Sequence, residues 1–148
     1  MTTTPHDERF MRLALDEARR ASEADEVPIG AVIVAGGQVV AKAHNLTERL
    51  CDVTAHAEMQ AITAAATALG GKYLPDCTLY VTVEPCLMCA GALAWAQIGR
   101  IVYGAADPKR GYSVQAPDCL HPRTQLQGGC LQDECATLIR DFFRNKRH

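Results

Sequence analysis

The sequence predicts an α/β protein in which a mixed sheet is covered by helices on both faces. Three observations favour this class: short β-branched segments alternate with helical ones, Gly36-Gly37 joins the first two strands directly, and helices separate the later strands. A two-glycine connection is typical of an antiparallel hairpin, whereas the order strand, helix, strand implies parallel pairing. The 148 residues fit one domain, 1–148, which needs no disulfides to bury a core.

Each element has its own signal. The first and last helices carry apolar residues at spacings of three and four, Gly70-Gly71 ends the second helix, and Pro85 favours the start of the third. The expected helices are 7–24, 55–69, 85–96 and 131–145. The expected strands are 29–35, 38–44, 78–83, 101–105 and a shorter candidate at 124–127. Segments 45–53 and 107–123 are expected to be loops, the second on the substrate side.

The composition excludes several functional classes. Apolar residues make up 48% and charged residues 22%, and the net charge of -2 gives no global basic signature, so nucleic-acid binding would need a local patch. Segment 1–9 lacks the apolar run of a secretory signal, and no stretch reaches the length of a membrane span. We therefore expect a cytoplasmic protein with no membrane partner.

The seven cysteines fall into two groups. Cys86 and Cys89 have a spacing typical of metal ligands. The other five have no role that the sequence assigns, and their odd total favours a reducing compartment over a disulfide framework. These five are Cys51, Cys77, Cys119, Cys130 and Cys135.

Two motifs supply side chains that bind zinc. His56 lies two residues before Glu58, and Cys86 and Cys89 directly follow Pro85. A catalytic zinc site keeps three protein ligands and leaves the fourth position for water. A histidine or a C-x-x-C alone is more often an ordinary structural feature, but their joint appearance before two successive helices favours one shared site. We therefore expect His56, Cys86 and Cys89 to hold one Zn²⁺ ion, although the same ligands accept iron or cobalt.

The expected role of Glu58 follows from helix geometry. A helix start presents free N–H groups and a partial positive charge, which favour the thiolates that a metal needs. Residues two apart do not share a face within a helix, so His56 and Glu58 can both lie near the metal only if His56 is at the helix start. Glu58 would then take a proton from zinc-bound water and deliver it to the leaving group.

These motifs resemble the cytidine/deoxycytidylate deaminase superfamily, whose zinc signature is H-x-E followed by P-C-x-x-C. The match is closer to the bacterial tRNA-specific adenosine deaminases, which form inosine at the anticodon wobble position. The resemblance implies a three-layer α/β/α cytidine-deaminase-like fold with a five-stranded mixed sheet, one zinc ion per subunit and a homodimer. It covers segments 26–32, 54–59, 79–86, 89–92, 98–105, 133–136 and 141–144.

The resemblance also implies substrate contacts. Asn45 resembles the base-contacting asparagine of the family, and Ile29 an apolar wall of the base pocket. Asp107 and Lys109 resemble residues near the anticodon loop, and Arg144 lies on a C-terminal helix that touches RNA in the family. Each has a structural alternative, since Asn45 can end a strand, Ile29 can be a core residue and Asp107 can form an ordinary turn.

The first functional hypothesis is a hydrolase that converts the wobble adenosine of a tRNA anticodon arm to inosine. Hydroxide from zinc-bound water would attack C6 of the flipped adenine, with Glu58 as the proton shuttle. Clustered positive charge would hold the phosphates. The sequence offers two such clusters, Lys109-Arg110 and the group of Arg144, Lys146, Arg147 and His148.

The second hypothesis keeps the chemistry and changes the substrate to a free base or nucleoside, such as guanine. The family usually has small residues after Lys109, whereas this chain has Arg110-Gly111-Tyr112-Ser113, and its Trp95-Ala96 pair is similar to guanine deaminases. Tyr112, or Phe142 with Phe143, would then close a pocket over a small purine or pyrimidine.

The third hypothesis belongs to another class: an inactive zinc-containing partner that binds RNA. A structural zinc site takes four protein ligands, so a fourth ligand such as Cys51 or His44 would favour it. Glu58 argues against it, because structural zinc requires no proton shuttle.

Overall fold

The computed structural model describes residues 3–146. Five helices and five strands alternate along this part of the chain. In chain order they are α1 (Pro5–Glu23), β1 (Gly30–Ala35), β2 (Gln38–His44), α2 (Ala57–Leu69), β3 (Cys77–Val83), α3 (Leu87–Trp95), β4 (Arg100–Ala105), α4 (Tyr112–Gln115), β5 (Gln125–Gln127) and α5 (Gln132–Lys146).

The strands form one mixed sheet of five in the order β2-β1-β3-β4-β5. β1 is antiparallel to both of its neighbours, whereas β3, β4 and β5 are parallel. The hairpin between β1 and β2 turns at Gly36 and Gly37, whose positive φ angles of 56° and 77° suit glycine. The predicted mixed sheet, its opening hairpin and the parallel pairing of the later strands are confirmed.

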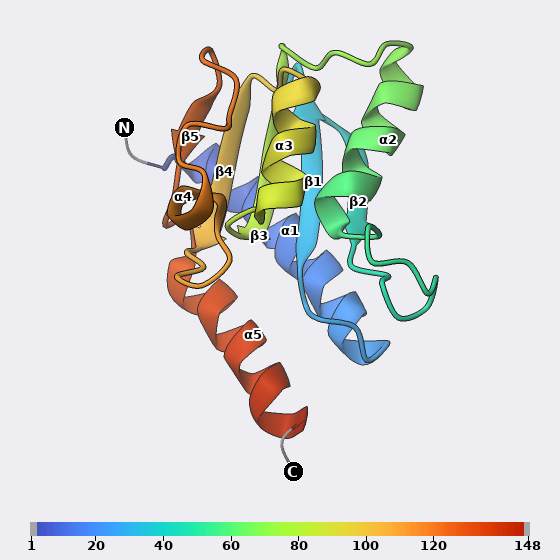
Figure 1. Cartoon of the computed structure of the whole chain (residues 1–148), viewed down its shortest axis with the longest axis vertical. Helices are drawn as coiled ribbons and strands as arrows, with labels where there is room; N and C mark the ends of the chain where they lie inside the picture. The colour runs from blue at the N-terminus through green and yellow to red at the C-terminus, as the bar shows by residue number, and fades with distance from the viewer. Residues whose placement is uncertain (1–2, 147–148) are drawn as a thin grey trace.

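Helices cover both faces of the sheet, so the molecule has three layers (Figure 1). On one face Ala31 and Ile33 of β1 pack in a core with α2 and α3. On the other face Val32 and Val34 pack in a second core with α1 and α5. This alternation follows from the two-residue period of a strand, and it explains why central strands are apolar throughout. The three-layer α/β/α architecture is confirmed.

Two contacts fix α1 against the sheet. A Cβ added at Gly30 would lie only 2.0 Å from the Ala14 carbonyl oxygen, so β1 approaches the α1 backbone more closely than any side chain permits. Near the other end, the buried carboxylate of Asp7 accepts hydrogen bonds from Tyr80 (2.9 Å) and from both terminal nitrogens of Arg100 (2.8 and 3.0 Å). Thus α1 is bound to β1, β3 and β4.

Most predicted boundaries differ from the observed ones by one or two residues, including the start of α2 at Ala57 in place of residue 55. Three differences have an identifiable cause. α1 begins at Pro5, because the Thr4 side chain and Asp7 form a capping box. α3 begins at Leu87 with Cys86 as its N-cap, so Pro85 precedes the helix and does not lie within its first turn. The predicted loop 107–123 contains the short α4, since four residues are too few to give a helical period.

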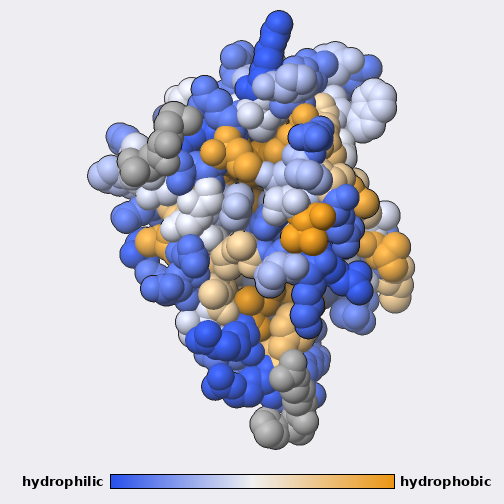
Figure 2. Space-filling model, turned by 60° about the vertical axis from the view of Figure 1, so that its left-hand side comes forward, coloured by the Kyte–Doolittle hydropathy of each residue, from blue (hydrophilic) through white to orange (hydrophobic). Residues whose placement is uncertain are grey.

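The molecular surface is mainly polar on the side that carries β5 and α4. Figure 2 shows hydrophobic side chains there in several separate patches among hydrophilic ones. Within residues 3–146, none of the helices combines the length and the apolar character that crossing a bilayer requires.

Candidate metal centre and active site

The candidate metal ligands lie where two helices begin. His56 is the N-cap of α2 and Cys86 the N-cap of α3, and both have extended backbone. These two helix starts lie at the same end of the sheet, the lower end in Figure 1. Because β3 and β4 are parallel, this is also the edge at which their carboxyl ends meet, the usual place for a site in an α/β sheet.

The ligand distances suit a tetrahedral zinc ion. The Nδ1 atom of His56 lies 3.7 Å from Sγ of Cys86 and 3.5 Å from Sγ of Cys89. With Zn–S bonds of about 2.3 Å and Zn–N bonds of about 2.0–2.1 Å, a tetrahedral angle places nitrogen and sulfur about 3.6 Å apart. All three ligand atoms lie within 4.8 Å of one another. The residues present therefore fit the metal without rearrangement.

The protonation of this group favours a metal-binding thiolate. Hydrogen bonds from Cys89 and His56 lower the pKa of the Cys86 thiol to about 4. The hydrogen bond to Cys86 raises the pKa of His56. The hydrogen bond between Cys89 and Cys86, together with burial, raises the pKa of the Cys89 thiol. Cys86 is thus anionic at neutral pH, the state in which sulfur binds a metal.

Glu58 lies on the first turn of α2, beside this group. It is only 3% exposed, and its Oε1 atom is a buried polar atom for which the described residues provide no hydrogen-bond partner. Burial raises the pKa of Glu58 to about 7. An unsatisfied buried carboxylate oxygen costs on the order of 1–3 kcal/mol or more, so its presence points to function and not to stability.

A fourth protein ligand is absent from the metal group formed by the described residues. Cys51 is exposed, and its thiol contacts the Glu48 carbonyl. His44 is paired with Glu17, with 3.0 Å between Nδ1 and Oε1. The prediction of the third hypothesis, a structural four-ligand site, is therefore not met. The arrangement has the three ligands of a catalytic centre.

Asn45 and Ile29 lie next to each other. The Asn45 backbone N–H donates to the Ile29 carbonyl (3.1 Å), and the Asn45 side chain is buried and accepts from Thr47 N–H. Gln60 of α2 ties the same region to the metal group, because its amide donates to the carbonyls of His44 (2.8 Å) and His56 (3.4 Å). The structure therefore joins the end of β2, where Asn45 lies, to the start of α2.

Asp107 and Lys109 lie on the loop between β4 and α4. The Asp107 side chain accepts hydrogen bonds from the N–H groups of Lys109 and Arg110, both at 3.0 Å, so it closes the turn as the structural alternative expected. Lys109 and Arg110 are exposed. Gly111 forms an isolated bridge with Cys86, which places this loop directly beside the metal helix.

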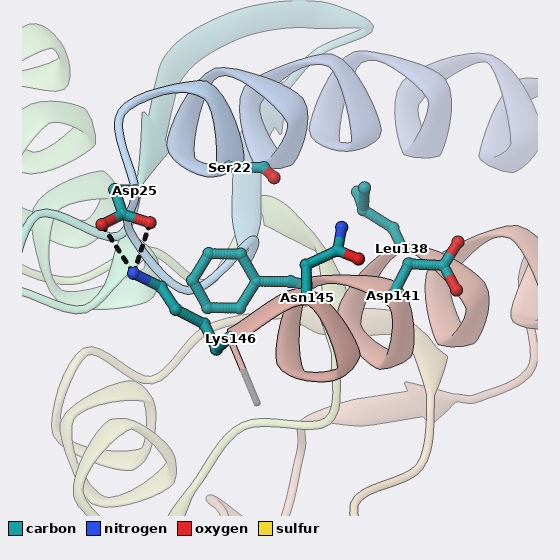
Figure 3. A pocket seen from close by; sticks show the side chains of 7 residues that line it. Ser22, Asp25, Leu138, Asp141, Asn145 and Lys146 are labelled. Atoms are coloured by element: carbon teal, nitrogen blue, oxygen red, sulfur yellow. Dashed lines mark hydrogen bonds and ion pairs between the residues drawn. The ribbon is translucent and has the colours of Figure 1, made fainter. Parts of the chain in front are cut away.

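Arg144 lies on α5 and is exposed, with an ion pair of 3.9 Å to Asp141 of the same helix. Beside it, a groove of about 610 Å³ separates the ends of α1 and α5, and Lys146 pairs with Asp25 across it (Figure 3). Arg147 and His148, which completed the predicted basic cluster, lie outside the described residues. Among the described residues, no hydrogen bond or ion pair links Arg144 to the metal group or its flanking loops, unlike the other candidate substrate contacts.

Two aromatic regions were expected to close a pocket in the second hypothesis. Tyr112 is 3% exposed and packs inside the structure, so it is no lid. Phe142 and Phe143 line a hollow of about 700 Å³ together with Val27 and Arg49, next to the loop that follows Asn45.

The remaining cysteines take no part in the metal group. Cys77, Cys130 and Cys135 are buried, and burial raises the pKa of each thiol, which keeps them neutral. Cys51 is exposed and Cys119 partly so. Among the described residues, none of these five cysteines belongs to the group formed by the three ligands.

Sequence reasoning missed two buried carboxylates that hold the loops around the site. Glu26 accepts from the N–H groups of Glu48 (3.0 Å) and Arg49 (2.8 Å). Glu84 accepts from Asp107 and Ser113. For Glu84 the available signal was an acidic residue directly before Pro85 at the end of an apolar run, where a solvated charge is not expected. Glu26 follows a polar segment, so the sequence carried no such signal for it.

Known proteins share both the fold and the motifs. A family model for the cytidine and deoxycytidylate deaminase zinc-binding region matches residues 4–105. The tRNA-specific adenosine deaminase of Agrobacterium fabrum is 50% identical over 145 residues, which cover 93% of this chain and 94% of that protein.

Two solved structures extend the comparison. One, from studies of A-to-I editing by tRNA:A34 deaminases at the wobble position of transfer RNA, matches with a TM-score of 0.82 and 48% identity over 88% of this chain and 98% of that one. A guanine deaminase from Bacillus subtilis matches with a TM-score of 0.64 and 36% identity over 77% of this chain and 70% of that one.

The fold and the three-ligand centre define a zinc-dependent hydrolytic enzyme whose site lies at the carboxyl edge of a mixed sheet. The chain belongs to the cytidine and deoxycytidylate deaminase family, and it is a zinc-dependent deaminase similar along nearly its whole length to tRNA-specific adenosine deaminases.

Proposed function

We propose that this protein converts the wobble adenosine of a tRNA anticodon arm to inosine. The observation that carries the proposal is the 50% identity to a tRNA-specific adenosine deaminase over 93% of the chain. It exceeds the 36% identity to a guanine deaminase structure, which covers less of the chain. The buried carboxylate of Glu58, whose Oε1 atom has no hydrogen-bond partner among the described residues, lies beside the three-ligand group and supports hydrolytic chemistry at this place.

His56, Cys86 and Cys89 hold the zinc ion in this proposal. The chemistry that zinc supplies in such a site is a lowered pKa of water, toward about 7. Glu58, which is not a ligand, accepts the proton that water loses and delivers it to the purine ring nitrogen. It then moves a second proton to the amino group that departs as ammonia. A carboxylate shielded from water keeps these protons within the site.

The loops on either side of the helix starts bind the substrate. Asn45 hydrogen-bonds the base, and Ile29 forms an apolar wall beside it, which is consistent with their adjacency in the structure. Asp107 and Lys109 lie near the anticodon loop on the opposite side. Arg144 contributes positive charge for phosphates from α5. Flipping a base out of an anticodon loop costs little free energy, because the bases of the loop are already partly unpaired.

We also propose that the protein acts as a homodimer in the cytoplasm. α3 carries Trp95, which is 85% exposed, and Leu87, which is 45% exposed. Gly91 lies between them, and a Cβ there would meet nothing within 4 Å. These three residues form an open apolar strip on one face of the helix, of the kind that interfaces between copies of a chain cover.

Turnover by zinc-loaded protein tests the proposal. An anticodon stem-loop with a wobble adenosine should yield inosine, and guanine, adenine and cytosine in parallel assays should remain unchanged. Raised salt should weaken stem-loop binding steeply, as expected when phosphates are contacted. Conversion of free guanine with an untouched stem-loop would instead move the assignment to purine salvage, the alternative that the Bacillus subtilis structure supports.

A further inference from the structure

Glu84 connects the metal helix to the loop between β4 and α4. It lies directly after β3 and two residues before Cys86, and it is only 4% exposed. Its Oε1 atom accepts a hydrogen bond from the Asp107 N–H at 3.1 Å. Its Oε2 atom accepts from the Ser113 N–H at 3.1 Å and from the Ser113 hydroxyl at 2.5 Å. One carboxylate thus binds both ends of segment 107–113.

The backbone of segment 107–113 packs closely against the Glu84 carboxylate. A Cβ added at Gly111 would lie 2.5 Å from Cδ and Oε2 of Glu84 and 2.6 Å from the Asp107 carbonyl oxygen. The Gly111 N–H donates to that same carbonyl at 3.0 Å. Only glycine therefore allows the chain to close this tightly over the Glu84 side chain.

The loop is also joined to the backbone that leads into α3. Tyr112 N–H donates to the Pro85 carbonyl at 3.0 Å, and Gly111 bridges to Cys86. These contacts leave Pro108, Lys109 and Arg110 as the exposed tip. The position of two cationic side chains relative to the metal helix is therefore set by what holds the two ends of the loop.

The stability of the fold alone does not explain why a carboxylate is buried at position 84. A buried carboxylate must be compensated, and three hydrogen-bond donors do so here, with no ion pair to Glu84 among the described residues. An apolar side chain at position 84 would avoid burying a charge, but it would leave the N–H groups of Asp107 and Ser113 without this acceptor. A carboxylate, by contrast, fixes donors in defined directions, which a loop that must present charges in one geometry requires.

We infer that Glu84 is a positioning residue for substrate: it holds segment 107–113 so that Lys109 and Arg110 meet the phosphates flanking the target nucleotide. The inference rests on the proposed function, since it concerns RNA and not a free base. Ser113 is its partner on the loop. Because the contact acts on phosphates outside the base pocket, its loss should weaken substrate binding and leave the chemical step intact.

The test compares three variants of the full chain. Ser113→Ala removes the hydroxyl hydrogen bond to Glu84 and leaves the Ser113 N–H, Glu84 and the three metal ligands in the chain. Glu84→Gln replaces one acceptor oxygen with an amide NH2 group, which is a donor facing the N–H groups of the loop. Thr124→Ala is the matched control, because it also loses one hydroxyl hydrogen bond, to the Ile98 carbonyl at 2.7 Å, away from the loop. The zinc content of each variant is measured first.

We expect Ser113→Ala to raise KM for the anticodon stem-loop about fivefold, with kcat within about twofold of native, and Glu84→Gln to raise it further. The salt dependence of binding should flatten, because fewer phosphate contacts form. Amide hydrogen exchange at Asp107 and Ser113 should speed up in both variants. Thr124→Ala should match the native protein in every respect.

Several results would overturn the inference. Native rates of amide hydrogen exchange at Asp107 and Ser113 in both variants would mean that the hydrogen bonds to Glu84 do not hold the loop. Faster exchange with native KM and salt dependence would make Glu84 purely structural. A loss of kcat in Ser113→Ala with full zinc would mean that the loop acts on chemistry and not on binding. Native protein that leaves the stem-loop unchanged would overturn the proposed function itself, a failure that precedes and is distinct from the other three.

Discussion

The backbone at His56 decides how Glu58 can act. His56 has φ -71° and ψ 156°, so it is extended and lies just outside α2. The rule that residues two apart diverge on a helix does not apply across this boundary, and both side chains can face the metal group. The sequence predicted this arrangement from the spacing alone. It did not predict that Nδ1 is the nitrogen facing the sulfurs, because ring orientation depends on tertiary packing.

The first prediction concerns Glu58. Replacing it with glutamine keeps the shape but removes the group that accepts and returns protons. We expect Glu58→Gln to lower kcat by about 10²–10⁴-fold, the usual contribution of a general acid–base residue. Turnover is measured on the anticodon stem-loop, with zinc content as a control. Native turnover in a fully zinc-loaded variant would remove Glu58 from the mechanism.

At the scale of elements, local signals predicted each strand and long helix but not how they are ordered. Gly36-Gly37 predicted the hairpin because the turn needs positive φ. No local sequence signal indicates that β1 lies between β2 and β3, because the pairing of β1 with β3 joins apolar strands that are far apart in the chain. The role of Glu84 was likewise hidden, because its donors lie 23 and 29 residues further along the chain.

The second prediction concerns how α1 is bound to the sheet. Burial opposes ionisation of Asp7, but hydrogen bonds from Arg100 and Thr4 outweigh it and lower its pKa to about 2. The unfolded chain has a pKa of about 3.9 for this group, so it binds the proton more readily than the folded protein does. The stabilisation is therefore complete above about pH 5 and is lost as the pH falls from about 4 toward 2.

The size of this effect follows from the lowered pKa of Asp7, about 2 in the folded protein and about 3.9 in the unfolded chain, and is about 2.6 kcal/mol. Asp7→Asn should lower the free energy of unfolding at pH 7 by about 2–4 kcal/mol, because Arg100 then lacks its partner. It should also flatten the loss of stability between about pH 4 and 2. Urea unfolding across this range measures both. An acid slope equal to that of the native protein would show that other carboxylates dominate.

The third prediction concerns the approach of α1 to β1. Gly30→Ala should destabilise the protein by about 3 kcal/mol or more, because the new methyl group would meet backbone atoms of Ala14 and Ala18. Gly71→Ala is the control, since its Cβ would meet nothing within 4 Å, and it should change stability by less than about 0.5 kcal/mol. Equal thermal midpoints for the two variants would contradict this account of the packing.

At the scale of the whole molecule, the proposed dimer interface lies on the surface of α3. The exposed side chains of Leu87 and Trp95 lie on the helix whose N-terminal end also carries the metal ligands Cys86 and Cys89. The sequence implied a dimer through resemblance to a family. It could not locate the interface, because an apolar residue on a helix is equally consistent with the core.

The fourth prediction tests that interface. Trp95→Glu places a charge on the open strip, so burying it against a second copy would be unfavourable. We expect the native protein to be a dimer in sedimentation equilibrium and the variant to be a monomer at the same concentration, with an unchanged circular dichroism spectrum. A monomeric native protein, or a variant that dimerises as well as the native one, would contradict the proposed interface.

The placement of the metal ligands on two different helix starts has a further mechanical consequence. His56 and Cys86 are 30 residues apart in the chain, and the segment between them includes α2 and β3. An ion that binds these ligands in the folded chain but not in the unfolded chain would stabilise the fold by its binding free energy. Removal of the ion by a chelator should therefore lower the unfolding temperature as well as stop turnover, so the catalytic ion would also stabilise the fold.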